Sequence, residues 1–209
     1  HAFGRLDSYE AYASAVPVVS YEDLRPEVMR MVGGERDVLW PGICRRYAQS
    51  SGTSGGKSKY IPITDDSLRD NHYAGGAAAV AHYLALYPRS RLFGGKSFIL
   101  GGSFANELTG LERGVRVGDL SATLIDAINP AVNLLRVPSK KIALMSDWSE
   151  KLPLLIERSL RSDITNISGV PSWFMTVLRG VMERAGTDRI HDVWPHLEVF
   201  FHGGISFEP

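Results

Sequence analysis

Four segments of the chain carry apolar residues at the spacing of an α-helix. The first begins at Ser20, which matches a capping box with Asp23 three residues later, and it ends at Gly33. The second follows Asp66 and ends near Pro88, and its small central residues predict close packing against a neighbour. These patterns predict two helices in the first half of the chain.

The other two helical patterns lie in the second half. One follows Asp147 and runs to residue 160, with Pro153 marking either a break or a first-turn position. The other opens at Pro171 and ends at Gly186. Each is predicted to bury the apolar stripe on one of its faces.

Short apolar runs alternate with these helices. The runs 97–100, 164–167 and 197–201 are each followed closely by glycine, and we predict that they are strands. Strand, helix, strand at this spacing indicates βαβ crossovers, so the predicted fold class is α/β, with a mostly parallel sheet and flanking helices. Ligands of such folds bind beyond the carboxyl ends of the strands, which here include residues 168–170 and 202–204.

Composition fits an ordinary globular domain. The chain has 209 residues, enough for a substantial core, and 44% of them are hydrophobic. Lys plus Arg and Asp plus Glu are both 23, so no basic field favours nucleic acid. The single cysteine, Cys44, excludes an intrachain disulfide and is expected to be a small buried apolar residue. With no signal sequence and no membrane-length apolar stretch, we expect one cytoplasmic domain.

The segment 50–59, Ser-Ser-Gly-Thr-Ser-Gly-Gly-Lys-Ser-Lys, has the chemistry needed to hold a polyphosphate. Glycines let successive backbone N–H groups converge on one anion, hydroxyls add donors, and a lysine supplies a mobile charge. We assign Lys59 and Thr53 as catalytic candidates, while Lys57 is also consistent with a solvent-facing role. The alternative is a Gly/Ser-rich surface linker. The predicted nucleotide-binding residues of the loop are Ser50, Ser51, Gly52, Thr53, Ser54, Gly55, Gly56 and Lys59.

Two other loop motifs fit less well. A Walker A loop needs four residues between its first glycine and Gly56-Lys57-Ser58, but Gly52 stands only three before. The run 52–56 also matches the esterase pattern G-x-S-x-G, with Ser54 as nucleophile. Both motifs run into a helix, whereas this loop runs into 60–63, a strand-like stretch with a proline. A loop between two strands is instead the arrangement found in acyl-adenylating enzymes.

The residues from Ser50 to Pro62 resemble the first signature of the Gretchen Hagen (auxin-responsive) acyl-acid amido synthetases, a branch of the adenylate-forming superfamily. The resemblance extends over nearly the whole chain. Its other parts are 16–24 and 38–42, similar to the family's lead-in, 168–174, similar to its acyl-pocket helix entry, and 201–206, similar to its adenine-side glycine pair.

The resemblance implies an ATP- and acyl-binding part of a large N-terminal domain, here incomplete over 1–209, without the small C-terminal domain. It implies that Gly203 and Gly204 contact adenine, although a plain strand-ending turn fits them equally well. Val170, Pro171 and Trp173 are the implied acyl-pocket residues. Trp173 is a better candidate than Phe174, which continues the core stripe, but core packing is the alternative for both aromatic residues.

The implied reaction is the ATP-dependent activation of a carboxylic acid to an acyl-adenylate, followed by amide formation with an amine or amino acid. Mg²⁺ would bridge phosphate oxygens, with most of its other ligands being water. No carboxylate can be assigned to it, and His191 and His196 lack the spacing of a metal site. We expect no nucleic-acid or membrane partner.

Two alternatives remain from the residues alone: a noncatalytic nucleotide- or ligand-binding domain, and a serine hydrolase. The chain starts at His1 without methionine and stops at Pro209. The family's later signatures are expected beyond Pro209. We therefore expect this chain to be a fragment that does not turn over by itself.

Overall fold

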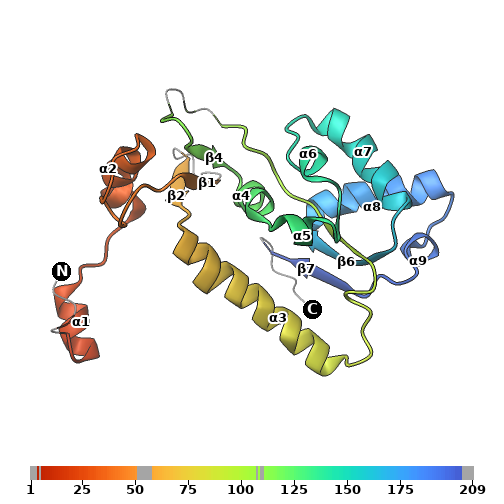
Figure 1. Cartoon of the computed structure of the whole chain (residues 1–209), viewed down its shortest axis with the longest axis horizontal. Coiled ribbons are helices and arrows are strands. Elements are labelled where there is room, and N and C mark those ends of the chain that lie inside the picture. The colour runs from red at the N-terminus through yellow and green to blue at the C-terminus, as the bar shows by residue number, and fades with distance from the viewer. Residues whose placement is uncertain (1–3, 5, 51–57, 107, 109–110, 204–209) are drawn as a thin grey trace.

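The computed structural model describes residues 4, 6–50, 58–106, 108 and 111–203 (Figure 1). Its helices are α1 (Tyr9–Ala15), α2 (Tyr21–Val32), the π-helical segment η2 (Ser67–Tyr73), α3 (Ala74–Leu86), α4 (Leu120–Ala127), α5 (Pro130–Asn133), α6 (Lys140–Ala143), α7 (Trp148–Leu160), α8 (Pro171–Ala185) and α9 (Ile190–Val193). Its strands are β1 (Arg46–Ser50), β2 (Lys59–Pro62), β3 (Lys96–Ile99), β4 (Arg116–Gly118), β5 (Arg136–Val137), β6 (Ile164–Gly169) and β7 (Val199–His202).

The larger sheet has the strand order β5-β3-β6-β7, and every neighbouring pair in it is parallel. This confirms the predicted α/β class with a parallel sheet and flanking helices. The central strand β6 is buried from Ile164 to Ile167, as expected for a strand covered on both faces. Helix α7 precedes β6 and α8 follows it, in agreement with the predicted crossovers (Figure 1).

Adjacent residues of β7 show which element covers each face of this sheet, because side chains alternate along a strand. Phe200 packs edge-to-face on Phe174 of α8, with ring centroids 5.2 Å apart, on the face that holds the main core. Phe201 points to the other face and contacts Tyr83 of α3 at 6.4 Å. The Glu198 carboxylate also accepts a hydrogen bond from the Tyr83 hydroxyl. Helix α3 therefore lies over the β7 side of the second face.

The smaller sheet has the order β2-β1-β4, with β1 antiparallel to β2 and parallel to β4. Helix α2 covers it, with Val28, Met31 and Val32 in a second core. The predicted start of this helix is confirmed, since the Ser20 N–H donates to the Asp23 carboxylate at 2.8 Å. Cys44 lies in the same core, buried as predicted.

An ionic cluster ties the two sheets together. Asp126 of α4 pairs with Arg116 of β4 at 2.6 Å and with Lys140 of α6 at 2.5 Å. Its side chain is only 19% exposed. Arg116 belongs to the smaller sheet, whereas Lys140 follows the edge strand of the larger one, so Asp126 connects the two.

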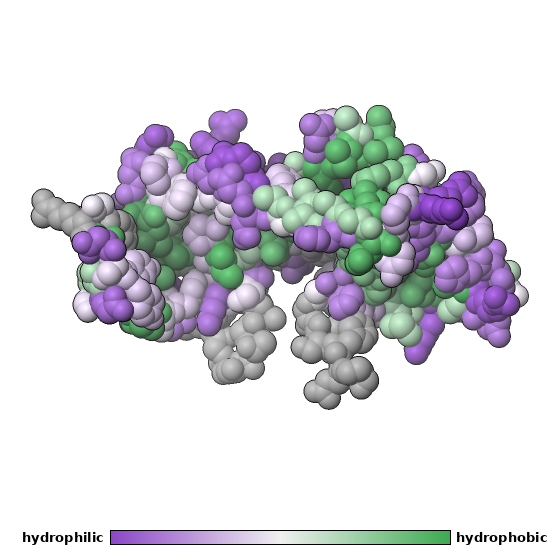
Figure 2. All heavy atoms as spheres, turned by 90° about the horizontal axis from the view of Figure 1, so that it is seen from below, coloured by the Kyte–Doolittle hydropathy of each residue, from purple (hydrophilic) through white to green (hydrophobic). Residues whose placement is uncertain are grey.

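The second predicted helix departs from expectation. It begins as the π-helical η2, in which Leu68 is buried, and continues as α3, in which no residue is buried. A Cβ added to Gly75 or Gly76 would meet nothing within 4 Å. The prediction of close packing at these small residues is therefore wrong for the part of the molecule that the structure describes. The helix is apolar on all sides, and Figure 2 shows apolar residues along its exposed face.

The other differences are smaller. Pro153 neither breaks α7 nor lies in its first turn, since the helix continues through it. The last strand starts at Val199, two residues later than predicted. Helices α1, α4, α5, α6 and α9 and strands β4 and β5 were not predicted; several have four residues or fewer and are too short for a periodic pattern. Within the described residues no helix combines the length and the apolar character needed to cross a membrane.

Replacement of Trp194 tests the main core. Its side chain is fully buried, its ring meets Phe98 edge-to-face at 5.8 Å, and its indole N–H donates to the Ser159 carbonyl at 3.2 Å. Trp194→Leu should lower the free energy of unfolding by about 3 kcal/mol, measured by urea denaturation. The half-exposed Trp40 is the matched control, and Trp40→Leu should cost less than about 1 kcal/mol. Equal losses would contradict this assignment of the core.

Replacement of Asp126 tests the ionic cluster. Burial alone would raise the pKa of Asp126, but the hydrogen bond from Lys140 and the charge of Arg116 outweigh it and hold the pKa below its usual range. A lowered folded-state pKa adds stability above the unfolded-state pKa, and this stability is lost as pH falls through the folded-state value. Asp126→Asn should therefore be less stable than wild type by a constant amount above about pH 5, with the gap closing below about pH 4 in urea titrations. A stability difference between wild type and Asp126→Asn that stays the same in acid would contradict a stabilising role for the ionised Asp126.

Candidate functional site

The carboxyl ends of β3 and β4 meet through their backbones. The Asp119 N–H donates to the Ser103 carbonyl, and the Ser103 N–H donates to the Asp119 carboxylate, each at 3.0 Å. A Cβ on Gly102 would lie 1.8 Å from that carboxylate, and one on Gly118 would lie 2.6 Å from the Ser103 carbonyl oxygen. Glycine at both positions thus lets the two sheets approach at their carboxyl ends.

The described residues that bound the predicted phosphate loop, Ser50 and Lys59, lie at the same end of the smaller sheet. In the parallel β1–β4 pair Ala48 is opposite Gly118, so Ser50 extends two residues further, level with the start of α4. Ser50 is also opposite Lys59 in the antiparallel β1–β2 pair. The prediction that strands flank the loop on both sides is therefore confirmed. The central loop residues lie outside the described residues: Ser51, Gly52, Thr53, Ser54, Gly55, Gly56 and Lys57.

Lys59 is exposed and its ammonium nitrogen lies 5.5 Å from the ring centroid of Tyr21. The Tyr21 hydroxyl accepts a hydrogen bond from the Tyr60 N–H at 2.7 Å, which fixes the ring under the lysine. Within the described residues Lys59 forms no ion pair. Beside it, the Gln49 amide donates to Ser58 at 3.1 Å, while Gln49 Oε1 is buried and has no hydrogen-bond partner among the described residues.

The end of β6 carries the predicted acyl-pocket residues. Gly169 has φ +155°, and a Cβ there would lie 2.7 Å from the carbonyl oxygen of Leu100, which directly follows the neighbouring strand β3. Val170 then caps α8 and Pro171 occupies its first turn, buried. The next two aromatic residues differ in exposure, in line with the prediction that Phe174 continues the core stripe. Phe174 is fully buried, whereas Trp173 is 38% exposed.

Trp173 lines a cavity of about 290 Å³ at the carboxyl end of β3. Its ring lies 6.2 Å from that of Trp148, the first residue of α7, at an angle of 47°. The floor contains Lys151, whose side chain is buried. The full lining is Gly101, Gly102, Ser103, Asp119, Met145, Ser146, Trp148, Lys151 and Trp173. We call this cavity the two-tryptophan pocket.

Trp148 and Lys151 were not predicted as site residues. A signal for Lys151 was present, because residues 148, 151 and 155 share one face of a helix, which places a lysine on an apolar stripe. The pairing of Trp148 with Trp173 has no such signal, since the two residues lie on different helices.

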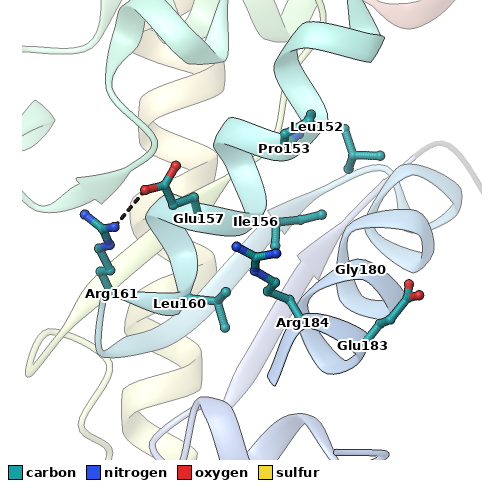
Figure 3. Close-up of a pocket in the computed structure, with 9 residues that line it drawn as sticks. All are labelled: Leu152, Pro153, Ile156, Glu157, Leu160, Arg161, Gly180, Glu183 and Arg184. Carbon is teal, nitrogen blue, oxygen red and sulfur yellow. Dashed lines mark hydrogen bonds and ion pairs between the residues drawn. The ribbon is translucent and has the colours of Figure 1, made fainter. Parts of the chain in front are cut away.

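The remaining predicted residues lie elsewhere. Gly203 follows β7, where an added Cβ would meet none of the described residues within 4 Å, and Gly204 lies outside the described residues. His191 contacts the Leu197 carbonyl and His196 pairs with Asp163, so both have packing roles. A separate cavity of about 720 Å³ lies between α7 and α8, with the Glu157–Arg161 pair on its rim (Figure 3). It contains none of the predicted site residues.

Comparison with known proteins gives consistent results. A family model described as the GH3 family N-terminal domain matches residues 1–209. The probable indole-3-acetic acid-amido synthetase GH3.2 of Oryza sativa subsp. japonica is 44% identical over 66 residues, which are 31% of this chain and 11% of the rice protein. The indole-3-acetic acid-amido synthetase GH3.6 of Arabidopsis thaliana is 39% identical over 66 residues, with the same two coverages.

Among solved structures, the chain is similar to the AtGH3.15 acyl acid amido synthetase in complex with 2,4-DB. The TM-score is 0.61 at 24% identity, over 85% of this chain and 31% of that chain. This similarity shows the fold. The chain spans about a third of the solved relative, and its matches span about a tenth of each plant synthetase.

Gly169→Ala tests whether the end of β6 must approach β3 closely. The added methyl group would meet the Leu100 carbonyl and the Phe174 ring, and the backbone conformation disfavours a side chain, so we expect a loss of about 1–3 kcal/mol in urea denaturation. Gly75→Ala, in open space within α3, should be neutral or slightly stabilising. A neutral Gly169→Ala would show that the close approach of β6 to β3 is not needed.

Proposed function

This chain belongs to the GH3 family, and from that premise we propose that it supplies the ATP- and acid-binding part of an acyl-acid amido synthetase. The reaction is the ATP-dependent activation of a carboxylic acid to an acyl-adenylate, followed by attack of an amine or amino acid to form an amide. The observation that carries the proposal is the β1–β2 hairpin, which puts Ser50 at the carboxyl end of β1 opposite an exposed Lys59 at the amino end of β2.

Donor groups and positive charge are what the first step requires. A carboxylate is already a nucleophile, so its attack on the α-phosphorus needs alignment and relief of charge rather than a general base. The Lys59 ammonium and the Ser50 hydroxyl offer a cation and a donor to phosphate oxygens. We assign Thr53 and the remaining loop hydroxyls and N–H groups to the same task, because they lie between these two residues in the sequence.

We assign the acid to the region near the start of α8. Val170, Pro171 and the half-exposed Trp173 lie where β6 ends, beside the two-tryptophan pocket. Trp148, Trp173 and Met145 give this pocket apolar surface that suits the organic part of an acid. Gly203 and Gly204, after β7, are assigned to adenine.

We expect Mg²⁺ to bind together with the nucleotide. It would neutralise phosphate charge, with ligands from phosphate oxygens and water, and no described residue is assigned to it. Cys44 is buried and unpaired with another cysteine, which suits a reducing compartment, and we propose a cytoplasmic location. The proposed partners are a small carboxylic acid and an amine.

The hairpin argues against two alternatives. A Walker A loop and a nucleophile elbow both lead directly into a helix, but here β2 begins at Lys59 and pairs with β1. A serine hydrolase with Ser54 as nucleophile therefore lacks its supporting geometry. A noncatalytic nucleotide-binding domain remains the competing hypothesis, and it predicts nucleotide binding without acid activation.

Exchange of pyrophosphate into ATP by the full-length protein tests the proposal. Exchange should require a carboxylic acid from a panel of aromatic and aliphatic acids. Lys59→Ala should reduce its rate by about 100-fold or more, because one charge-stabilising donor is removed. Lys141→Ala, an exposed lysine on α6, is the matched control and should leave the rate unchanged. Nucleotide binding without exchange for every acid would favour the noncatalytic hypothesis.

A further inference from the structure

Lys151 is a buried cation at the floor of the two-tryptophan pocket. It is 2% exposed, and its ammonium donates hydrogen bonds to three backbone carbonyls. These belong to Gly101 at 2.7 Å, Ala143 at 2.7 Å and Met145 at 3.3 Å. An ammonium group has three protons, so all of its donors are used.

This arrangement is electrostatically costly. Burial lowers the pKa of Lys151, and the charge of Asp119 opposes that shift only in part. Within the described residues no carboxylate lies within ion-pair distance of Lys151. The lysine also lies near the N-terminus of α7, where the helix dipole disfavours positive charge. The three carbonyls are therefore the main compensation for burying this charge.

The three carbonyls come from three different segments. Gly101 follows β3, Ala143 ends α6, and Met145 lies in the connection between α6 and α7. Gly101 and Met145 line the pocket themselves. The lysine also lies 6.0 Å from the ring centroid of Trp148 on its own helix. The Lys151 side chain thus joins the end of β3, the connection between α6 and α7, and Trp148.

We propose that Lys151 is a positioning residue for the acid substrate. It holds the Gly101–Gly102 turn and Trp148 at the separation that makes the pocket fit an acyl group. Because its donors are all occupied, Lys151 acts through the walls of the pocket and does not itself bind the substrate carboxylate. This inference rests on the proposed function, since it assigns the pocket to the acid.

A positioning role and a purely structural role predict different kinetics. If Lys151 shapes the acid pocket, its removal should change the KM for the acid and leave the KM for ATP near its original value, because the strands that flank the proposed phosphate loop, β1 and β2, belong to the other sheet. If it only stabilises the fold, its removal should lower the melting temperature without a selective effect on the acid.

The experiment compares Lys151→Met, Lys151→Gln and Lys151→Arg in the full-length protein by ATP–pyrophosphate exchange, with the melting temperature recorded for each. Lys151→Met should raise the KM for the acid by about tenfold, with less than about a twofold change for ATP. Gln, which can still donate to two carbonyls, should have an intermediate effect. Lys141→Met, the same substitution at an exposed position, is the matched control and should change neither constant.

Combination with Trp148→Leu tests whether Lys151 acts through the tryptophan. The single replacements should each raise the KM for the acid, and the double replacement should raise it by much less than the product of the two effects. Three results would each overturn the proposal. The first is an unchanged KM for the acid in folded Lys151 variants, and the second is a double replacement that raises this KM by the full product of the two single effects. The third is failure of all three Lys151 variants to fold. Wild-type protein without acid-dependent exchange would instead contradict the proposed function.

Discussion

The arrangement of the molecule depends on the close approach of two backbones, at Gly101–Ser103 after β3 and at Gly118–Asp119 at the end of β4. Two hydrogen bonds between Ser103 and Asp119 join the sheets there, and the spacing leaves no room for a side chain on Gly102 or Gly118. Because β1 is parallel to β4, Ser50 at the end of β1 lies at the same end of the smaller sheet as this contact. Ser50 and Lys59 of the β1–β2 hairpin and the carboxyl end of β3 are thereby brought to one side of the molecule.

Stability and site formation are separated in this fold. The apolar core lies between the large sheet and helices α7 and α8, where Phe98, Phe174 and Trp194 pack edge-to-face. The costly groups gather at the carboxyl ends of the strands instead: a buried lysine held by carbonyls, a glycine with positive φ, and two partly exposed tryptophans. Such a distribution is expected when a rigid core must support a site whose groups are individually unfavourable.

Much of the fold could be predicted because its signals are local. The capping box at Ser20, the glycine at 186 and the apolar periodicity of α8 each depend on neighbours within one or two turns, and the structure confirms them. The close packing expected of α3 was wrong because composition shows which residues can pack tightly, not whether a partner is present. The prediction that Phe174 rather than Trp173 belongs to the core was correct, since the helical period places Phe174 on the core stripe and Trp173 beside it.

The sequence by itself determined the α/β class, the flanking of the Ser/Gly/Lys loop by strands, and the family to which the chain belongs, because these depend on short-range periodicity and on a contiguous motif. The tertiary structure decided which strand ends meet, that Trp148 faces Trp173, and that Lys151 joins three segments. Those contacts link residues from separate elements of the chain. Such pairings follow from strand order and glycine-permitted backbone approach, which no local pattern encodes.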